Sequence, residues 1–296
     1  MIKIVQSFWS KPFYKKHNLN LNDRAKGGWL TEMNYFLSAA YSCLKLKEFY
    51  ADVVLVTDSI GKKLLIDEFE IPFTETIVEL DRLNHYSDEL WALGKIYAYS
   101  LQNEPFLHVD SDVYIWEPFK KSLLKKDLIV QNFEATKYPY QELSKQAIEY
   151  LSYFPDEMKE YVHNYGRIGE YSAINAGILG GNNIQFFKDF TGKAFKIIDQ
   201  NYKDLRKIDL GWFNLFYEQS LFYCLALKSK QKIGRLYQNV SDDYIEIKGL
   251  SMVPYKSYVH AIATMKNHVG INENIYLRLM NEYPTVFKRI YNHFKK

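Results

Sequence analysis

The sequence predicts an α/β fold with a mixed, mostly parallel central sheet flanked by helices. Over the first 110 residues, short apolar runs rich in β-branched residues alternate with helical stripes, which is the rhythm of a parallel sheet. The apolar run at 106–109 ends abruptly in Asp110-Ser111-Asp112, as expected of a buried strand that delivers polar groups to a sheet edge. With 296 residues, 47% of them hydrophobic, the chain can bury a sizeable core.

The elements follow in order from the N-terminus. Residues 2–5 predict a short strand, and Thr31 is expected to cap a helix with an apolar stripe. That stripe consists of Met33, Phe36, Leu37, Ala40 and Leu44. Residues 53–57 and 76–80 predict strands separated by a helix around 62–68, and a helix from near Ser87 leads into the strand that ends at Asp110.

The second half begins with a polar, Tyr-rich segment at 135–170, whose helical spacing predicts an insertion or a lid over a site. A strand at 173–179 follows, and then helices near 183–202 and 215–228. Pro284 separates two short helical stretches in the tail. We expect one domain over residues 1–284 and a basic C-terminal helix at 285–296.

Composition excludes several classes of protein. Lys and Arg outnumber Asp and Glu by 38 to 35, so the net charge of +3 gives no reason to expect a nucleic-acid partner. Cys43 and Cys224 lie in apolar segments without metal-ligand spacing, and the first residues are typical of a strand rather than a signal peptide. No apolar run approaches the ~20 residues that span a bilayer. A reducing, cytoplasmic location is expected.

Asp110 and Asp112 are candidate ligands of a metal ion. Both carboxylates can face one divalent ion if the strand breaks into a turn, because their oxygens are hard ligands suited to Mg or Mn. An Asp-x-Asp triplet taken alone is more often a solvated turn. The position after an apolar strand favours the metal site, since open α/β sheets bind ligands at the carboxyl ends of their strands.

Four short motifs follow one another along the chain. They are a D-x-D, an N-x-G, a Glu-Gln pair, and a His and a Lys six residues apart, at Asp110–Asp112, Asn175–Gly177, Glu218-Gln219, and His260 with Lys266. In this order they resemble the motifs of GT-A-fold nucleotide-sugar glycosyltransferases, in particular the glycogenin-like and bacterial galactosyltransferase-like families. The chain departs from that pattern in having Glu218 for an Asp and Ala263 for the Gly of H-x-x-G-x-x-K. It also lacks the Pro-Trp that follows the Lys.

The resemblance implies a GT-A-like domain and a division of roles. Asp110, Asp112 and His260 would hold the metal ion, Lys266 would meet the donor diphosphate, and Ser111 would lie with them. Asn175 and Gly177 would lie beside the donor sugar, with Glu218 or Gln219 near the reacting carbon. Further donor contacts are expected at Gln6, Ser7, Asp58 and Lys95.

The chemistry fits these residue types. Transfer of a sugar from a nucleotide diphosphate leaves negative charge on the departing phosphate, which a metal ion and Lys266 would stabilise. A UDP-sugar is the favoured donor. The spacing of His260 and Lys266 belongs to members that retain the anomeric configuration, so retention is favoured; inversion would need a general base such as Glu218.

Each candidate also has a structural explanation. His260 suits a hydrogen-bonded histidine at a strand end, and Lys266 a solvated loop lysine. Gly177, Gly180 and Gly181 suit either a close backbone approach or a turn before a helix. For Glu218 and Gln219, the polar face of an amphipathic helix is slightly favoured by the sequence alone.

The tail at 286–296 interleaves apolar and basic residues. As a helix it could rest on an anionic membrane, which would suit a lipid-linked or lipopolysaccharide-type acceptor at the inner face of a bacterial envelope. Packing of its apolar side onto the domain explains the pattern equally well. The expected partners are therefore a nucleotide-sugar donor and a glycan or lipid-linked acceptor.

Two other functions compete with the transferase. A metal-dependent phosphotransferase or nuclease would use Asp110 and Asp112 to hold Mg on a phosphate, which leaves the later motifs unexplained. A non-catalytic sugar-binding protein with the same fold is the second, since a fold alone does not determine activity.

Overall fold

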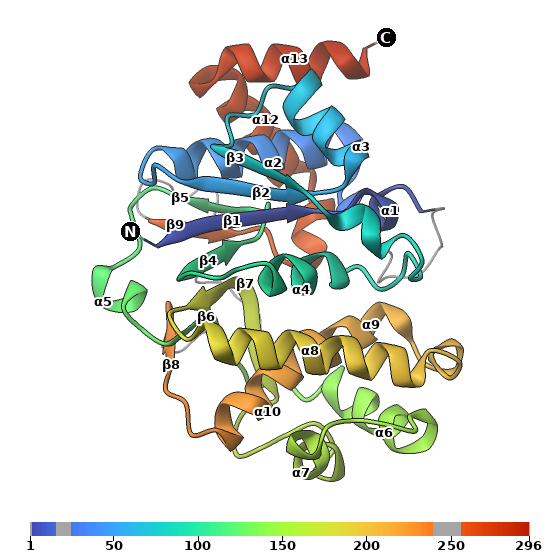
Figure 1. Ribbon diagram of the computed structural model, residues 1–296. Helices are drawn as coiled ribbons and strands as arrows, with labels where there is room; N and C mark the ends of the chain where they lie inside the picture. The colour runs from blue at the N-terminus through green and yellow to red at the C-terminus, as the bar shows by residue number, and fades with distance from the viewer. Residues whose placement is uncertain (1, 16–24, 239–255, 296) are drawn as a thin grey trace. The chain divides into compact units, whose positions relative to one another are not determined.

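The computed structural model describes residues 2–15, 25–238 and 256–295 (Figure 1). These residues form two compact units. Unit 1 contains residue 2 and the ranges 89–108 and 120–238. Unit 2 contains the described residues of 3–88, together with 109–119 and 256–295. The expectation of one domain over 1–284 stays a prediction.

Unit 2 joins parallel strands to a long helix and the C-terminal helices. Its elements are β1 (Lys3–Phe8), α1 (Ser10–Phe13), η1 (Ala25–Gly28), α2 (Glu32–Lys47), β2 (Val53–Thr57), α3 (Ser59–Lys62), η2 (Lys63–Glu68), β3 (Glu75–Val78), η3 (Leu80–Leu83), β5 (Val113–Ile115), β9 (Tyr258–His260), η8 (Ala263–Asn267), α12 (Val269–Glu282) and α13 (Pro284–Phe294). Strands β1 and β2 pair in parallel, as do β2 and β3. Helix α2 contacts β2, α12 and α13, and it lies between the parallel strands and the two C-terminal helices (Figure 1).

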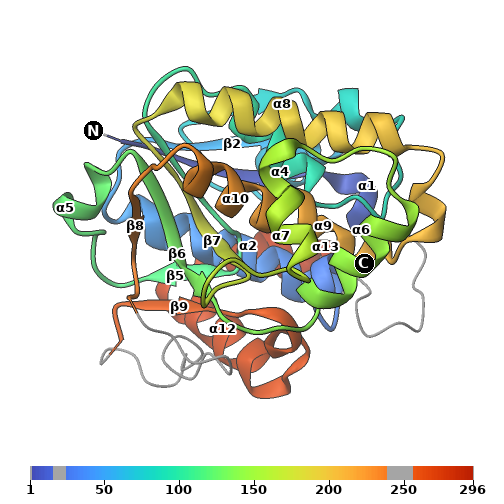
Figure 2. The same cartoon turned by 90° about the horizontal axis from the view of Figure 1, so that it is seen from below.

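Unit 1 is built around four strands. Its elements are α4 (Leu93–Ser100), β4 (Phe106–Val109, of which the last residue counts with unit 2), α5 (Lys121–Leu124), β6 (Leu128–Glu134), α6 (Tyr140–Tyr150), η4 (Asp156–Met158), α7 (Lys159–His163), β7 (Ala173–Gly181), α8 (Ile184–Asn201), η5 (Leu205–Lys207), α9 (Leu210–Leu215), η6 (Phe216–Ser220), α10 (Leu221–Lys228) and β8 (Ile233–Arg235). Strand β6 pairs antiparallel with β7 and parallel with β8. Helices α6 and α7 pack on each other (Figure 2).

The predicted fold class is confirmed. Within the described residues, the strand order of the large sheet is β3-β2-β1 in unit 2 and β4-β7-β6-β8 in unit 1. Every residue of β2 is buried, which explains its unbroken apolar sequence. At the start of α2, the side chain of Thr31 accepts a hydrogen bond from the backbone N–H of Asn34, so the predicted cap is present.

Some predicted boundaries are wrong. The helix expected from near Ser87 begins only at Leu93. Just before it, the backbone N–H of Ala92 donates a hydrogen bond at 2.9 Å to the side chain of Asn214, which is distant in sequence. The helix expected at 215–228 is in fact α9, a π-helical turn and α10, and 63–68 is also π-helical. Strands β5 and β9 were not predicted, because each has only three residues.

The basic C-terminal helix is present as α13, separated from α12 at Tyr283. It buries Val286, Phe287 and Ile290. Arg289 forms an ion pair with Glu70, just beyond η2, at 2.7 Å, and Nδ1 of His293 lies 2.8 Å from Oε2 of Glu68 in η2. The apolar side of α13 therefore packs within unit 2. Among the described helices, none is both long and apolar enough to cross a bilayer.

Candidate functional site

The Asp110–Asp112 segment forms a turn that helix α2 holds in place. The backbone N–H of Val113 donates to the carbonyl oxygen of Asp110 at 3.0 Å and closes the turn. Ser38 and Ser42, one turn apart on α2, donate from their hydroxyls to the carbonyls of Ser111 (2.9 Å) and Val113 (2.6 Å). The strand thus breaks into a turn, as a shared metal ion requires.

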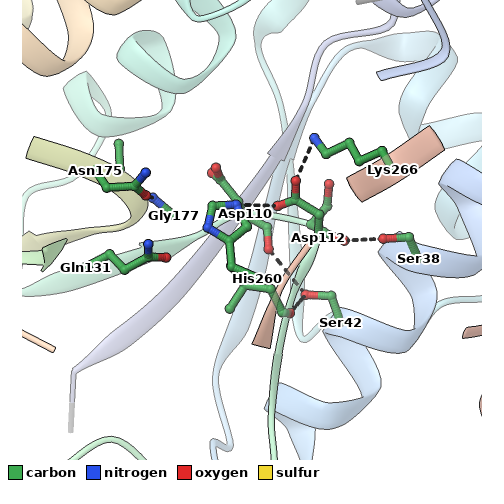
Figure 3. A network of polar contacts seen from close by, with 12 residues as sticks. Ser38, Ser42, Asp110, Asp112, Gln131, Asn175, Gly177, His260 and Lys266 are labelled. Atoms are coloured by element: carbon green, nitrogen blue, oxygen red, sulfur yellow. Dashed lines mark hydrogen bonds and ion pairs between the residues drawn. The ribbon is translucent and has the colours of Figure 1, made fainter. Parts of the chain in front are cut away.

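His260 reaches the same place through the short β5–β9 ladder. His260 lies opposite Val113 in this antiparallel pair, and the N–H of Ala261 donates to the carbonyl of Asp112 at 2.9 Å. As a result, Nε2 of His260 lies 3.4 Å from Oδ1 of Asp112. One potential ligand atom from each of Asp110, Asp112 and His260 lies within 4.8 Å of the others (Figure 3).

Lys266 provides the positive charge of the site. Its Nζ lies 2.6 Å from Oδ2 of Asp112 and donates to the carbonyl oxygen of Gly27 at 3.4 Å. Burial raises the pKa of the Asp112 carboxyl, but Lys266 and His260 lower it more, so the net pKa lies well below its usual range. Asp112 is therefore an anion at neutral pH although it is only 5% exposed.

The loop between His260 and Lys266 keeps a backbone shape that favours glycine. Ala263 has a φ of 48°, in the left-handed region. A residue with a Cβ is disfavoured there, and Gly is the residue of the resembled motif at this position. Ala263 therefore takes a backbone conformation that suits glycine better than alanine.

The three groups fit a divalent metal ion. Oδ1 of Asp112 is buried and has no hydrogen-bond partner among the described residues, although it faces the imidazole of His260. A buried carboxylate oxygen without a hydrogen bond is costly unless another group meets it. Two carboxylates and one imidazole form a ligand set suited to Mn or Mg, although the identity of the metal stays a prediction.

The other donor contacts expected in unit 2 differ in their surroundings. Gln6 is buried and donates from Nε2 to the hydroxyl of Ser42 at 2.8 Å, which links β1 to the turn-holding face of α2. Ser7 is half-buried on the same strand. Asp58 is 1% exposed and accepts from Ser10 N, Ser10 Oγ and Gly61 N at 2.6–2.7 Å, so both of its oxygens are engaged within the unit.

Unit 1 contains a buried ion pair at the Glu-Gln motif. Glu218 is fully buried, and its Oε1 lies 2.9 Å from Nζ of Lys95 and accepts from the hydroxyl of Tyr99 at 3.3 Å. Lys95 also donates to the carbonyl of Ala176 at 3.2 Å. Burial lowers the pKa of the nearby His108 well below its usual value, and Lys95 lowers it further, so His108 is neutral. Lys95 and Glu218, far apart in sequence, are thus brought together.

A second network in unit 1 joins the N-x-G motif to Gln219. Asn175 donates from Nδ2 to Oε1 of Glu134 at 2.8 Å and accepts from the N–H of Gly177 at 3.0 Å (Figure 3). The hydroxyl of Tyr140 contacts Oε2 of Glu134 and lies 3.1 Å from Oε1 of Gln219. Asn175 and Gln219 are therefore linked through the carboxylate of Glu134 and the phenol of Tyr140.

The solvated helical face expected for Glu218 and Gln219 is wrong. Both are buried, at 0% and 9% exposure, because every residue from Phe216 to Ala226 is buried, so this stretch has no solvated face. The close approach considered for the glycines is correct for Gly180, where a Cβ would lie 2.1 Å from the carbonyl oxygen of Phe106. That approach is to backbone of the same unit.

The sequence analysis missed Glu134, Tyr140 and the α2 serines. Glu134 ends the strand β6, but Gln131 and Asn132 interrupt the apolar run before it, so the signal is weaker than the one before Asp110. Ser38 and Ser42 are polar residues four apart within a buried helix face, and that spacing could have been noticed. Tyr140 gave no local signal.

Comparisons with known proteins give one family and several similar structures. A family model described as "Family of unknown function (DUF6734)" matches residues 2–293. No curated protein matches the sequence. The structure is similar to the bifunctional glycosyltransferase WbbM, with 11% identity, a TM-score of 0.47 and coverage of 97% of this chain and 51% of WbbM. The chain thus spans about half the length of WbbM.

Two further structures are similar at low identity. The galactosyltransferase LgtC, in complex with donor and acceptor sugar analogues, is 12% identical, with a TM-score of 0.39 and coverage of 73% of this chain and 70% of LgtC. The glycosyltransferase GlyE of Streptococcus pneumoniae TIGR4 is 10% identical, with a TM-score of 0.46 and coverage of 99% and 65%.

Proposed function

Because the chain belongs to the DUF6734 family, which has no known function, its activity has to be inferred from its own residues, and we propose that it is a metal-dependent glycosyltransferase. It would move a sugar from a nucleotide-diphosphate donor, preferably a UDP-sugar, to a glycan or lipid-linked acceptor with retention of configuration. The observation that supports this most is the convergence of Asp110, Asp112 and His260 on one point beside Lys266.

The groups of unit 2 suit the diphosphate. Asp110, Asp112 and His260 would hold a Mn or Mg ion, which when bound supplies a Lewis acid for the departing phosphate. Lys266 lies in the short helix η8, which begins at Ala263 with its left-handed backbone, and its ammonium already lies against an anion. A diphosphate oxygen would offer it a second anionic partner.

The groups of unit 1 suit a sugar. Amides and carboxylates recognise hydroxyls, and Asn175, Gln219 and Glu134 supply three such side chains in one hydrogen-bonded network. Glu218 is fully buried and paired with Lys95. It is therefore poorly placed to take a proton from the hydroxyl of an acceptor that enters from solvent. This pairing supports retention over an inverting reaction that uses Glu218 as base.

Calorimetric titration of UDP and GDP tests the donor assignment. Wild-type protein should bind a nucleotide in Mn and lose most of that binding in EDTA. Asp112→Asn should bind it at least about ten-fold more weakly, since it removes a charged metal ligand. The matched control is Asp67→Asn, the same change at an exposed carboxylate of unit 2 that pairs with Lys62, and it should bind as wild type.

The outcomes separate the competing functions. Binding of UDP followed by release of UDP from a UDP-sugar in Mn supports the transferase. Metal-dependent cleavage of a phosphodiester without nucleotide-sugar turnover would favour the phosphotransferase. A folded wild-type protein that binds neither nucleotide in Mn or Mg would contradict the proposal.

A further inference from the structure

Unit 1, which contains the polar network, also carries an aromatic pair in which Tyr138 is exposed and Trp212 is half-buried. Tyr138 is 63% exposed, among the most exposed large side chains of the described residues. Its ring lies edge-on to that of Trp212, with centroids 5.7 Å apart and an interplanar angle of 78°. Tyr138 precedes α6 and Trp212 lies in α9, two helices that contact each other (Figure 2).

Hydrogen bonds fix the backbone that carries Tyr138 and Trp212. The hydroxyl of Thr136 donates to the carbonyl of Tyr138 at 3.0 Å, and the N–H of Trp212 donates to the side chain of Asp209 at 3.3 Å. Asp209 is tied to α6 in turn, since its N–H donates to Oε1 of Gln146 at 3.1 Å. The exposed ring of Tyr138 and the half-buried ring of Trp212 are therefore both held by hydrogen-bonded backbone.

The polar ends of both rings are available to a ligand. Within the described part of the chain, neither the phenol of Tyr138 nor the indole N–H of Trp212 has a hydrogen-bond partner. A single exposed aromatic residue is unremarkable on a protein surface. Two rings in contact, each with an apolar face and a free polar end, form a surface suited to an amphipathic ligand.

Two residues beyond Tyr138 the chain enters the polar network. The hydroxyl of Tyr140 contacts Glu134 and Gln219, and Glu134 is partly exposed. The short segment 134–140 thus contains both the aromatic ring of Tyr138 and the carboxylate of Glu134, which is linked to the amides of Asn175 and Gln219. A pyranose ring has matching chemistry, with a face of C–H groups and a rim of hydroxyls. Ligand sites of this kind combine aromatic lining with a few placed polar groups.

We propose that Tyr138 and Trp212 form a stacking platform for a sugar ring of the acceptor, and that Glu134 accepts hydrogen bonds from its hydroxyls. This inference rests on the proposed transferase function, because it takes the bound sugar to be the acceptor. The acceptor is then a glycan, or the glycan portion of a lipid-linked molecule, that exposes a pyranose face.

The test is glycan binding in the absence of nucleotide. Wild-type protein and four variants are applied to an array of bacterial and eukaryotic glycans, and the best ligand is titrated with tryptophan fluorescence or calorimetry. Tyr138→Ala and Trp212→Ala should weaken binding about ten-fold or more, because each removes a ring face. Tyr138→Phe keeps the ring and should retain most of the affinity.

The matched control is Tyr202→Ala, which removes another exposed tyrosine of unit 1, 51% exposed, at the end of α8. It should bind glycans as wild type. All four variants should keep the affinity for UDP in Mn. Unfolding of Trp212→Ala would leave Tyr138→Ala as the deciding variant, since its side chain is mostly in solvent.

The two proposals fail in different ways. A wild-type protein that binds no glycan on the array, or a folded Tyr138→Ala that binds the best ligand as tightly as wild type, overturns the platform and leaves the donor site untouched. A wild-type protein that binds glycan but not UDP would contradict the proposed transferase function. The platform would then be the binding site of a sugar-binding protein.

Discussion

Ala263→Gly should stabilise the protein, although most Ala→Gly changes do the opposite. Ala263 has a φ of 48°, where the Cβ of an L-residue costs about 1–2 kcal/mol relative to the right-handed region. Glycine avoids that cost but adds about 0.4–1 kcal/mol of conformational freedom to the unfolded chain. Ala263 is exposed, so little packing is lost with its methyl group.

The net expectation is a gain of about 0.5–1 kcal/mol, which corresponds to a rise in Tm of about 1–3 °C for a chain of this size. The measurement is urea and thermal unfolding followed by far-UV circular dichroism, without added metal. Ala51→Gly is the matched control, because Ala51 is also exposed in unit 2 but has an ordinary φ. That variant should lose about 0.4–1 kcal/mol.

The two variants should therefore shift Tm in opposite directions. Equal losses in both would refute the strain assigned to Ala263 and, with it, the view that the loop from His260 to Lys266 keeps a glycine-type course. A gain in Ala263→Gly with unchanged UDP affinity would show that the strain affects stability alone.

Three other changes test the polar interior. Glu218→Gln should cost about 3–5 kcal/mol in urea unfolding, because it removes the charge of a fully buried carboxylate that pairs with the Lys95 ammonium; a double Glu218→Leu/Lys95→Met variant that loses as much as the sum of the Glu218→Leu and Lys95→Met changes would contradict this. Tyr140→Phe should cost about 1–3 kcal/mol, since Tyr140 is fully buried and its hydroxyl meets two polar partners; an unchanged urea midpoint would argue against that network. Asp112 has a folded pKa below the unfolded value of about 3.9, so its stabilisation is complete at neutral pH and is lost as pH falls below about 4. Asp112→Asn should accordingly flatten the fall in stability between about pH 5 and pH 3, whereas identical pH profiles would show that this carboxyl is not specially stabilised.

Much of the fold was visible in local patterns. The strand Val53–Thr57 matches its predicted bounds, since a fully buried parallel strand needs an unbroken apolar run. Thr31 caps α2 as predicted, because a cap depends on residues three apart. The turn at Asp110–Asp112 and its closeness to His260 were anticipated through the order of motifs.

What the sequence could not predict depends on contacts between distant residues. Helix α4 begins late, where Asn214 accepts the hydrogen bond of Ala92, and no local signal records that partner. Gln219 is buried because the stretch Phe216–Ala226 is covered on all sides by the rest of the protein, and a polar residue in a helix does not reveal such cover. Glu134 joins Asn175 only across paired strands, and the register of that pairing is set by the whole sheet.

The ion pair between Lys266 and Asp112 has a consequence for how metal binding should be measured. If the proposed metal ion binds here, it would compete with the Lys266 ammonium for the Asp112 carboxylate, so the affinity for metal alone would reflect a competition between two cations. A diphosphate offers the displaced ammonium another anion. Metal and nucleotide should therefore each increase the affinity for the other by the same factor, as thermodynamic linkage requires. Titration of metal into nucleotide-free protein would then underestimate how tightly the metal ion is held when the donor is bound.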